Sequence, residues 1–236
     1  MSMLAAGEPR SLLADMRAGV GDIWPIMVAA TPIGLLFGAL CAAKGLSPAE
    51  SVLMSILVFA GGAQFAAVEL WTYPVPVATL VFSTLLINAR HILMGASLAP
   101  KLGRFSWPQR LAGLYFLTDE SWALAERRAQ HSPLMPAYWF AVAALLPVAW
   151  VGSTLVGAMA GSLMGDPKQI GADFAFTALF IGLVAGFWRG SATGIVVAAS
   201  GAASAVVYTL AGPPWHVLAG ALCGIAAAFA VGGDKR

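Results

Sequence analysis

Charged side chains are scarce in this sequence. They make up 10% of the 236 residues, against about 25% in soluble proteins, whereas hydrophobic residues make up 59%. These few polar groups could not cover the surface of a water-soluble globule of this size. The lipid bilayer is therefore the expected solvent. The formal net charge of +2 offers no basic face to phosphates, which argues against nucleic-acid binding.

Cysteine and catalytic motifs are also nearly absent. Cys41 and Cys223 lie inside apolar runs with no neighbouring cysteine or histidine, which excludes a disulfide framework or a zinc site. We expect both to be small core residues. The chain has no phosphate-binding Gly-x-x-x-x-Gly-Lys-[Ser/Thr] loop. His91 and Ser97 fall on different faces of a helix, so they do not form a nucleophile and base. We expect neither an enzyme nor a cofactor.

Long uncharged windows recur along the chain. A spanning helix needs about twenty mostly apolar residues, and Gly, Pro and short charged loops separate windows of that order. The sequence therefore predicts an all-α integral membrane protein, a compact bundle of about eight (seven or eight) transmembrane helices, some kinked or broken. It forms a single domain over residues 1–236. The expected spans are about 23–43, 50–70, 77–99, 108–125, 137–164, 173–188, 190–210 and 214–231. The second and third of them either cross fully or re-enter.

Basic residues divide unevenly between the two sides of such a bundle. Seven lie on the N-terminal side, namely Arg10, Arg17, Arg127, Arg128, Arg189, Lys235 and Arg236, and five on the other, namely Lys44, Lys101, Arg104, Arg110 and Lys168. The positive-inside rule then places both termini in the cytoplasm. Charges at Arg10, Asp15 and Arg17 interrupt any signal-peptide core, so the first helix is expected to be retained.

Two glycine pairs share one spacing. Gly34 and Gly38 in the first expected span correspond to Gly157 and Gly161 in the fifth. Small residues four positions apart let helix backbones approach closely. The pairs are either packing grooves or the trace of an internal repeat.

Asn88, Arg90 and His91 form the first polar cluster inside an apolar span. Ionisable groups at membrane depth cost about 2.5–3.5 kcal/mol each, so they face the interior, pair with one another or line a pathway. On a helix, Asn88 and His91 share a face, and Arg90 points about 160° from Asn88. Arg90 either grips a ligand carboxylate with its forked guanidinium, or it pairs with an internal acid or reaches the headgroups near Lys101.

Thr118, Asp119 and Glu120 form the second cluster. Adjacent helical positions diverge by about 100°, so both acids cannot face one partner. In one interpretation, one acid meets Arg90 or His91 and the other faces a cavity, where it would exchange a proton. In the other, the pair lies in water at the membrane interface.

Gly61, Gly62 and Gln64 are the third feature, in the middle of the second expected span. Adjacent glycines invite a helix break, which frees backbone groups to meet a polar ligand. Alternatively, the glycines allow close packing and Gln64 makes an interhelical hydrogen bond. Prolines at 25, 32 and 147 likewise indicate kinked, partly opened helices.

The remaining acids have local explanations. Asp22 and Asp173 each precede an expected span, where a carboxylate stabilises the positive end of the helix dipole. Glu69 lies beside Trp71 and Tyr73, which is typical of an interfacial belt.

Four motifs resemble one protein family. They are Phe59-Ala-Gly-Gly-Ala-Gln-Phe65, Asn88-Ala-Arg-His-Ile-Leu-Met-Gly95, Leu98-Ala-Pro100 and Leu117-Thr-Asp-Glu120. In this order and spacing they resemble the AzlC family of branched-chain amino acid exporters, over about residues 17–230. The resemblance implies a large permease subunit in the cell (inner) membrane that exports valine, leucine, isoleucine and sometimes methionine. It also implies a small, separately encoded membrane partner of the AzlD type.

A branched-chain amino acid presents a carboxylate, an ammonium and an apolar side chain. In our hypothesis Arg90 or free amides near Gly61 and Gly62 hold the carboxylate, and an acid meets the ammonium or carries a coupled proton. The candidate substrate-binding residues are Gly61, Gly62, Gln64, Asn88, Arg90 and His91, and the coupling residues are Asp119 and Glu120. The alternative is a channel-like or structural subunit that does not transport on its own.

Overall fold

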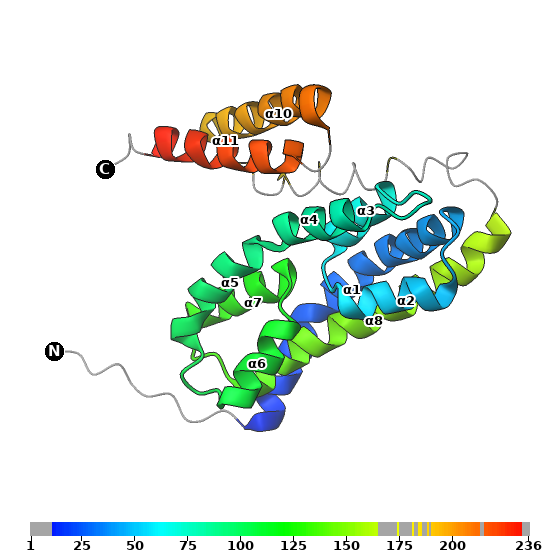
Figure 1. The fold of residues 1–236 in the computed structure, drawn as a ribbon. Helices are drawn as coiled ribbons and strands as arrows, with labels where there is room; N and C mark the ends of the chain where they lie inside the picture. The colour runs from blue at the N-terminus through cyan, green and yellow to red at the C-terminus, as the bar shows by residue number, and fades with distance from the viewer. Residues whose placement is uncertain are drawn as a thin grey trace.

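The computed structural model describes residues 11–164, 174, 181, 184–185, 188, 190–212 and 215–232. Within them every regular element is a helix (Figure 1). The elements are α1 (Leu12–Ala43), α2 (Pro48–Leu57), α3 (Gly61–Glu69), α4 (Val77–Asn88), α5 (Arg90–Leu98), the 3₁₀ helix η1 (Ala99–Lys101), α6 (Trp107–Tyr115), α7 (Asp119–Ala129), α8 (Pro136–Met164), α10 (Ser191–Ala211) and α11 (Trp215–Gly232).

The fold class predicted from the sequence is confirmed. Four helical segments are long and apolar enough to cross a membrane, namely Leu12–Ala43, Val77–Lys101, Pro136–Gly161 and Ser191–Ala211. The expected span over residues 173–188, with Asp173, lies outside the described residues apart from a few single positions.

Helix α1 begins earlier than predicted. It starts at Leu12 rather than at residue 23, because the Ser11 side chain accepts a hydrogen bond from the Ala14 amide at 3.2 Å. Asp22 therefore lies inside the helix, and the prediction that it caps a helix start is wrong. Its carboxylate accepts a hydrogen bond from the Tyr138 hydroxyl at 2.8 Å. A tertiary contact, rather than a helix dipole, accounts for this acid.

The two glycine pairs meet at the contact between α1 and α8. A Cβ on Gly38 would overlap the Thr154 carbonyl oxygen, and one on Gly157 would overlap that of Leu35. The pairs are therefore packing grooves, and they let the two helices lie against each other along much of their length (Figure 1). Both helices run in the same direction and remain helical through their internal prolines.

Residues 48–69 form a hairpin of two short helices, the re-entrant option for the second expected span, in place of a single helix over 50–70. The extended backbone of Ala60 (φ −152°, ψ 97°) ends the path of α2, and α3 starts afresh at Gly61. Lys44, just before α2, donates from Nζ to the Glu69 carbonyl at the end of α3, at 3.1 Å. Both ends of this first hairpin therefore lie at the end of the molecule where α1 terminates, here called the Lys44 end.

Residues 107–129 form a second hairpin, which likewise corrects the predicted span over 108–125. Thr118 caps α7, accepting a hydrogen bond from the Ser121 amide at 3.1 Å, and this new helix start reverses the chain. Lys101, before α6, pairs with Glu126 near the end of α7 at 2.6 Å. This hairpin enters from the end opposite Lys44. The tips of the two hairpins meet where Tyr115 donates a hydrogen bond to the Ile56 carbonyl.

Helices α4 and α5 carry the third interruption and connect the two ends. They are separated at Ala89, whose amide donates to the Leu86 carbonyl at 3.3 Å. Two units of the chain thus share one arrangement and run in opposite directions. One unit is α1 with the first hairpin, and the other is α4–α5 with the second hairpin. Each is a long helical segment followed by a hairpin that re-enters from the end where that segment stops.

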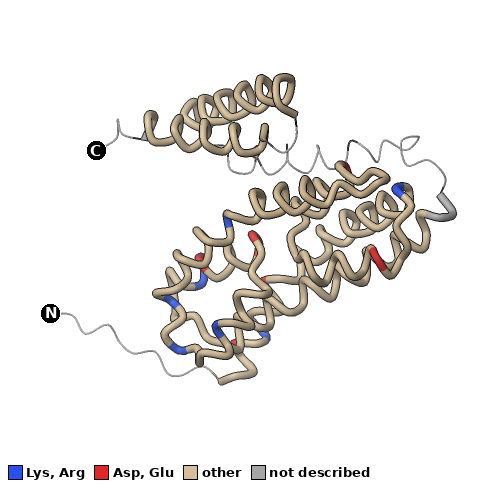
Figure 2. The backbone as a smooth tube through the Cα atoms, viewed as in Figure 1, with Lys and Arg blue, Asp and Glu red and all other residues tan. Residues whose placement is uncertain are grey.

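Basic residues gather at the end where α1 begins, here called the basic end (Figure 2). In the described part of the chain these are Arg17, Lys101, Arg104, Arg110, Arg127 and Arg128. The opposite end has Lys44. The count made from the sequence divided these residues between two sides because it let residues 50–70 and 108–125 cross the membrane. The two hairpins bring Lys101, Arg104 and Arg110 to the same end as Arg17.

Helices α10 and α11 form an antiparallel pair. Gly220 on α11 faces Ser204 on α10, and the rings of Trp215 and Phe82 on α4 are 5.3 Å apart. Cys41 is buried as predicted, but the prediction for Cys223 is wrong because that residue is exposed. One face of α11 packs on α10. Cys223 lies outside that contact and is exposed in the part of the chain that the structure describes.

Two apolar clusters stabilise the helices on either side of their midpoints. One lies toward the basic end and includes Ile23 and Tyr138, and the other lies toward the Lys44 end and includes Phe37 and Phe65. Ile33 on α1 lies between them along the chain. The interruptions between α2 and α3, between α4 and α5, and between α6 and α7 meet between these two clusters.

Candidate functional site

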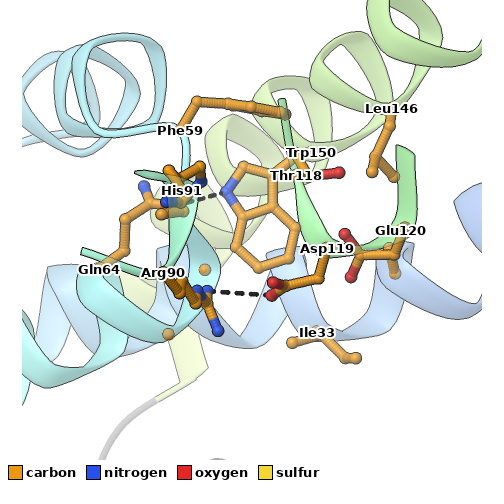
Figure 3. A pocket seen from close by; sticks show the side chains of 14 residues that line it. Ile33, Phe59, Gln64, Arg90, His91, Thr118, Asp119, Glu120, Leu146 and Trp150 are labelled. Atoms are coloured by element: carbon orange, nitrogen blue, oxygen red, sulfur yellow. Dashed lines mark hydrogen bonds and ion pairs between the residues drawn. The ribbon is translucent and has the colours of Figure 1, made fainter. Parts of the chain in front are cut away.

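A cavity of about 110 Å³ lies where the two hairpin tips and the α4–α5 interruption meet (Figure 3). Helices α1 and α8 supply the rest of its wall. Its lining residues are Ala30, Ile33, Phe59, Ala60, Gly61, Gly62, Gln64, Arg90, His91, Thr118, Asp119, Glu120, Leu146 and Trp150. Residues distant in the sequence converge here because each interruption lies halfway along its segment.

The cavity brings together most of the residues predicted from the sequence. These are Gly61, Gly62, Gln64, Arg90, His91, Asp119 and Glu120. Asn88 lies elsewhere, in an adjoining hollow with Tyr115. Two helical steps turn by about 200°, so Asn88 and Arg90 face different ways. Substrate contact by any of these residues stays a prediction.

Arg90 and Asp119 form an ion pair, which is the internal pairing that the sequence predicted as one option. Arg90 Nη2 lies 3.0 Å from Asp119 Oδ2, and the two side chains are 35% and 44% exposed. The buried Nε of Arg90 has no hydrogen-bond partner within the described residues. The guanidinium is therefore anchored to Asp119 through Nη2, and the Arg90 side chain lines the cavity.

Three helices start at the cavity. Gly61, Arg90 and Asp119 are the first residues of α3, α5 and α7. The N-caps of α3 and α5 are alanines, which make no side-chain hydrogen bond to the first-turn amides. First-turn amides without a side-chain cap and the positive end of the helix dipole at the start of α3 favour a negative group. The start of α3 therefore places partial positive charge beside Arg90, whose own charge is paired with Asp119.

Glu120 supplies an unneutralised negative charge at the same cavity. Its side chain is exposed, and within the described residues no hydrogen bond or ion pair is formed by its carboxylate. Asp119 meets Arg90, whereas Glu120, one helical step further on, does not. The site thus offers both a cation and a carboxylate that has no partner within the described residues.

His91 joins the start of α5 to the second hairpin. Its Nδ1 lies 3.0 Å from the Asn88 carbonyl oxygen, and its Nε2 lies 3.2 Å from the Leu117 carbonyl oxygen. His91 is thus engaged with the backbone on two sides and lines the cavity with its ring.

Gln64 is fully buried, with 0% exposure. Its carbonyl accepts a hydrogen bond from Trp150 Nε1 at 2.9 Å, and its amide nitrogen donates to Ser55 Oγ at 3.0 Å. Both ends of the side chain are therefore occupied by protein, as in the interhelical interpretation. Sequence reasoning did not identify Trp150, because a tryptophan in an apolar helix carries no signal that separates a cavity wall from a lipid-facing ring.

Ion pairs at the basic end fix the second hairpin to the rest of the molecule. Arg128 Nη2 lies 2.8 Å from Asp15 Oδ1, and Arg127 Nη2 lies 3.2 Å from Asp22 Oδ1. Arg128 also lies over the Tyr138 ring, 4.7 Å from its centroid. These contacts tie the end of α7 to α1 and α8, so movement of the hairpin tip must be hinged within the hairpin or break them.

Interrupted helices that enclose charged groups at the middle of an apolar bundle are the construction of membrane transport proteins. Comparison with known sequences agrees with this class. The family described as AzlC protein matches residues 25–164. The match covers more than half of the chain, and the chain belongs to the AzlC family. Membership supports a role in transport.

Curated relatives extend this likeness over most of the chain. An uncharacterized membrane protein of Archaeoglobus fulgidus is 31% identical over 84% of this chain and 86% of its own. The inner membrane protein YgaZ of Escherichia coli is 29% identical over 92% and 91%. The branched-chain amino acid transport protein AzlC of Bacillus subtilis is 28% identical over 71% and 66%. No solved structure matches the chain.

Proposed function

We propose that this protein is a secondary exporter of branched-chain amino acids. It acts as the large subunit beside a small membrane partner of the AzlD type and is coupled to protons. The observation that carries the proposal is the cavity in which the Arg90–Asp119 pair, three helix starts and the free carboxylate of Glu120 face one another. The name of the Bacillus subtilis relative supports the same substrate class.

The walls of the cavity complement each part of the substrate. Arg90 and the first-turn amides of α3 meet the carboxylate, and Glu120 meets the ammonium. Ile33, Leu146 and Trp150 provide an apolar surface for the aliphatic side chain. The volume of about 110 Å³ is comparable with the roughly 150 Å³ cavity that holds a benzene. It is smaller than the roughly 300–1,000 Å³ of drug-sized sites, which favours a small amino acid.

The paired hairpins favour a carrier over a pore. In transporters built from inverted repeats, one half rocks against the other around a fixed central site. Here two re-entrant hairpins from opposite ends meet at the cavity, so either tip can open it to one side. Glu120 couples the cycle to protons if it must be neutral in one of the two facing states.

The distribution of charge favours one orientation. The basic end carries all the described Lys and Arg residues except Lys44 and Arg90. By the positive-inside rule this end faces the cytoplasm, with the start of α1. The cell membrane is the location consistent with the relative named as an inner membrane protein.

Transport by purified protein in proteoliposomes tests the function. We expect the chain with its small partner to accumulate radiolabelled valine against a gradient when the lumen is acidic relative to the bath, because leaving protons drive valine inward. Glu120→Gln removes the proton carrier. That variant should show no accumulation above the bath concentration while valine still exchanges for valine.

The same assay separates the alternatives. Movement only down the gradient in the wild-type complex would indicate a channel, and no movement with the partner present would indicate a structural subunit. Glu50→Gln is the matched control, because Glu50 lies at the start of α2 and bonds the Ser47 amide at 2.7 Å, away from the cavity. It should accumulate valine as the wild type does.

Cysteine labelling tests the orientation. We expect Gly103→Cys, in the loop before α6, to react with a membrane-impermeant maleimide only after the cytoplasmic membrane is opened. Tyr73→Cys, near the Lys44 end, should react in intact spheroplasts. Gly103 has open space around its Cβ position, and Tyr73 is 69% exposed. Cys223→Ser provides the background, since Cys41 is buried. The reverse labelling pattern would contradict the orientation.

A further inference from the structure

A buried chain of hydrogen bonds links the cavity wall to both helices of the first hairpin. Trp150 on α8 donates to Gln64 on α3, and Gln64 donates to Ser55 on α2. Ser55 Oγ lies 3.1 Å from Thr154 Oγ1, one turn beyond Trp150 on α8. Gln64, Ser55 and Thr154 are all 0% exposed. Such a network leaves Trp150 one permitted orientation.

The Trp150 ring is packed against Phe37 on one face and lies close to Gly61 at one edge. It stacks on Phe37 with centroids 6.1 Å apart and an interplanar angle of 25°. A Cβ on Gly61 would lie 3.3 Å from Trp150 Cη2, which is tighter than an ordinary van der Waals contact. Figure 3 shows the ring facing the same cavity as Arg90 and Asp119. The stacking on Phe37 and the hydrogen bond to Gln64 therefore both hold the ring in this position.

We propose that Trp150 determines the substrate specificity of the cavity and that Gln64 positions its ring. This inference rests on the proposed function. The indole forms the rigid wall against which the substrate's aliphatic side chain packs, opposite the groups that hold its carboxylate and ammonium. Amino acids with side chains larger than the branched aliphatic ones meet the ring and are excluded. Gln64 acts through Trp150 and does not touch the substrate.

The proposal predicts opposite changes in substrate preference when the cavity is widened and when it is narrowed. Trp150→Leu removes the ring and widens the cavity, so phenylalanine should bind better relative to valine by at least about tenfold, the effect of a change of one or more methylene-sized spaces. Gly61→Ala presses a methyl group against the ring and narrows the cavity. It should lower the binding of leucine and methionine relative to alanine.

The positioning role of Gln64 is tested with Gln64→Met. Methionine fills similar space but cannot accept the indole bond as the amide oxygen does, so the ring loses its fixed orientation. We expect the preference for valine over phenylalanine to fall several-fold while the ring is still present. Trp150→Phe should show the same partial loss, because it keeps an aromatic wall without the donor.

Trp139 is the matched control on the same helix. It is 2% exposed, lies in the cluster toward the basic end, and its indole nitrogen has no hydrogen-bond partner within the described residues. Trp139→Phe therefore changes a buried tryptophan of α8 without touching the cavity. Its ratio of phenylalanine to valine binding should equal that of the wild type.

Competition against radiolabelled valine, with full-length protein and its small partner in detergent, measures these ratios. An unchanged phenylalanine-to-valine ratio in a Trp150→Leu protein that elutes as the wild type does would overturn the inference. If that variant does not fold, an unchanged leucine-to-alanine ratio in Gly61→Ala overturns it. Absence of valine binding by the wild type would instead refute the proposed function, and this inference with it.

Discussion

Arg90→Ala is expected to lower the initial rate of valine transport by about a hundredfold. A charge-assisted hydrogen bond contributes about 1.5–3 kcal/mol, and a factor of ten corresponds to about 1.4 kcal/mol. The variant loses the group that we propose holds the carboxylate, and it leaves Asp119 without its partner. Arg90→Lys keeps the charge but lacks the planar fork, so a loss of about tenfold is expected. Transport in proteoliposomes measures both.

A double variant separates substrate binding from structural pairing. The two side chains are 35% and 44% exposed, so the pair contributes less to stability than a fully buried one. In Arg90→Ala with Asp119→Asn neither member of the pair leaves a charge that has lost its partner, and the protein should fold as the wild type does. Transport should stay low. Recovery of transport in the double variant would mean that Arg90 only neutralises Asp119. Arg104→Ala, in the loop before α6, is the control and should transport normally.

Most of the residues that line the cavity could be predicted from the sequence because they are polar or charged residues within apolar segments. Arg90, Asp119 and Glu120 stand in apolar windows where an isolated charge is costly. That cost demands convergence on a shared interior, whatever the path of the chain. Pairing of Arg90 with one of the two acids was one of the options that the same reasoning left open, and the structure pairs it with Asp119. Neither inference depends on where the helices start and end.

The path of the chain could not be predicted in the same way. A hydropathy window over residues 50–70 or 108–125 has the length of a span, and it does not distinguish a helix that crosses from one that turns back. The reversal takes only the three residues 58–60 in one hairpin and 116–118 in the other. A local signal did exist at the second one, since Thr118 and Ser121 form a capping box inside the window.

Residues whose roles depend on distant partners were beyond the reach of local patterns. Trp150 bonds to Gln64, which is 86 positions away in the chain. Asp22 bonds to Tyr138, 116 positions away. For Asp22 the nearest pattern was a helix start, and that interpretation was wrong because the helix begins a few turns earlier. The parallel packing of α1 on α8 brings Asp22 to Tyr138. The packing of the first hairpin against α8 brings Gln64 to Trp150.

That packing leads to the second large expected effect, a loss of stability in Gly157→Ala. The added Cβ would overlap the backbone carbonyl of Leu35, and a backbone cannot move aside as a flexible side chain can. Overpacking of this kind costs about 1–3 kcal/mol and occasionally more. We expect the melting temperature of the purified protein to fall by about 5–10 °C, since each kcal/mol shifts it by roughly 2–4 °C at this chain length.

Gly152→Ala on the same helix reverses the sign of the effect. Gly152 is exposed and has open space at its Cβ position, so alanine there should stabilise the helix by about 0.5–1 kcal/mol. Gly38→Ala, on the opposite side of the contact, should destabilise as Gly157→Ala does. Because both methyl groups force apart the same two helices, the double variant should lose less than the sum of the single losses. Additive losses, or equal melting temperatures for Gly152→Ala and Gly157→Ala, would show that the glycines do not define one shared contact.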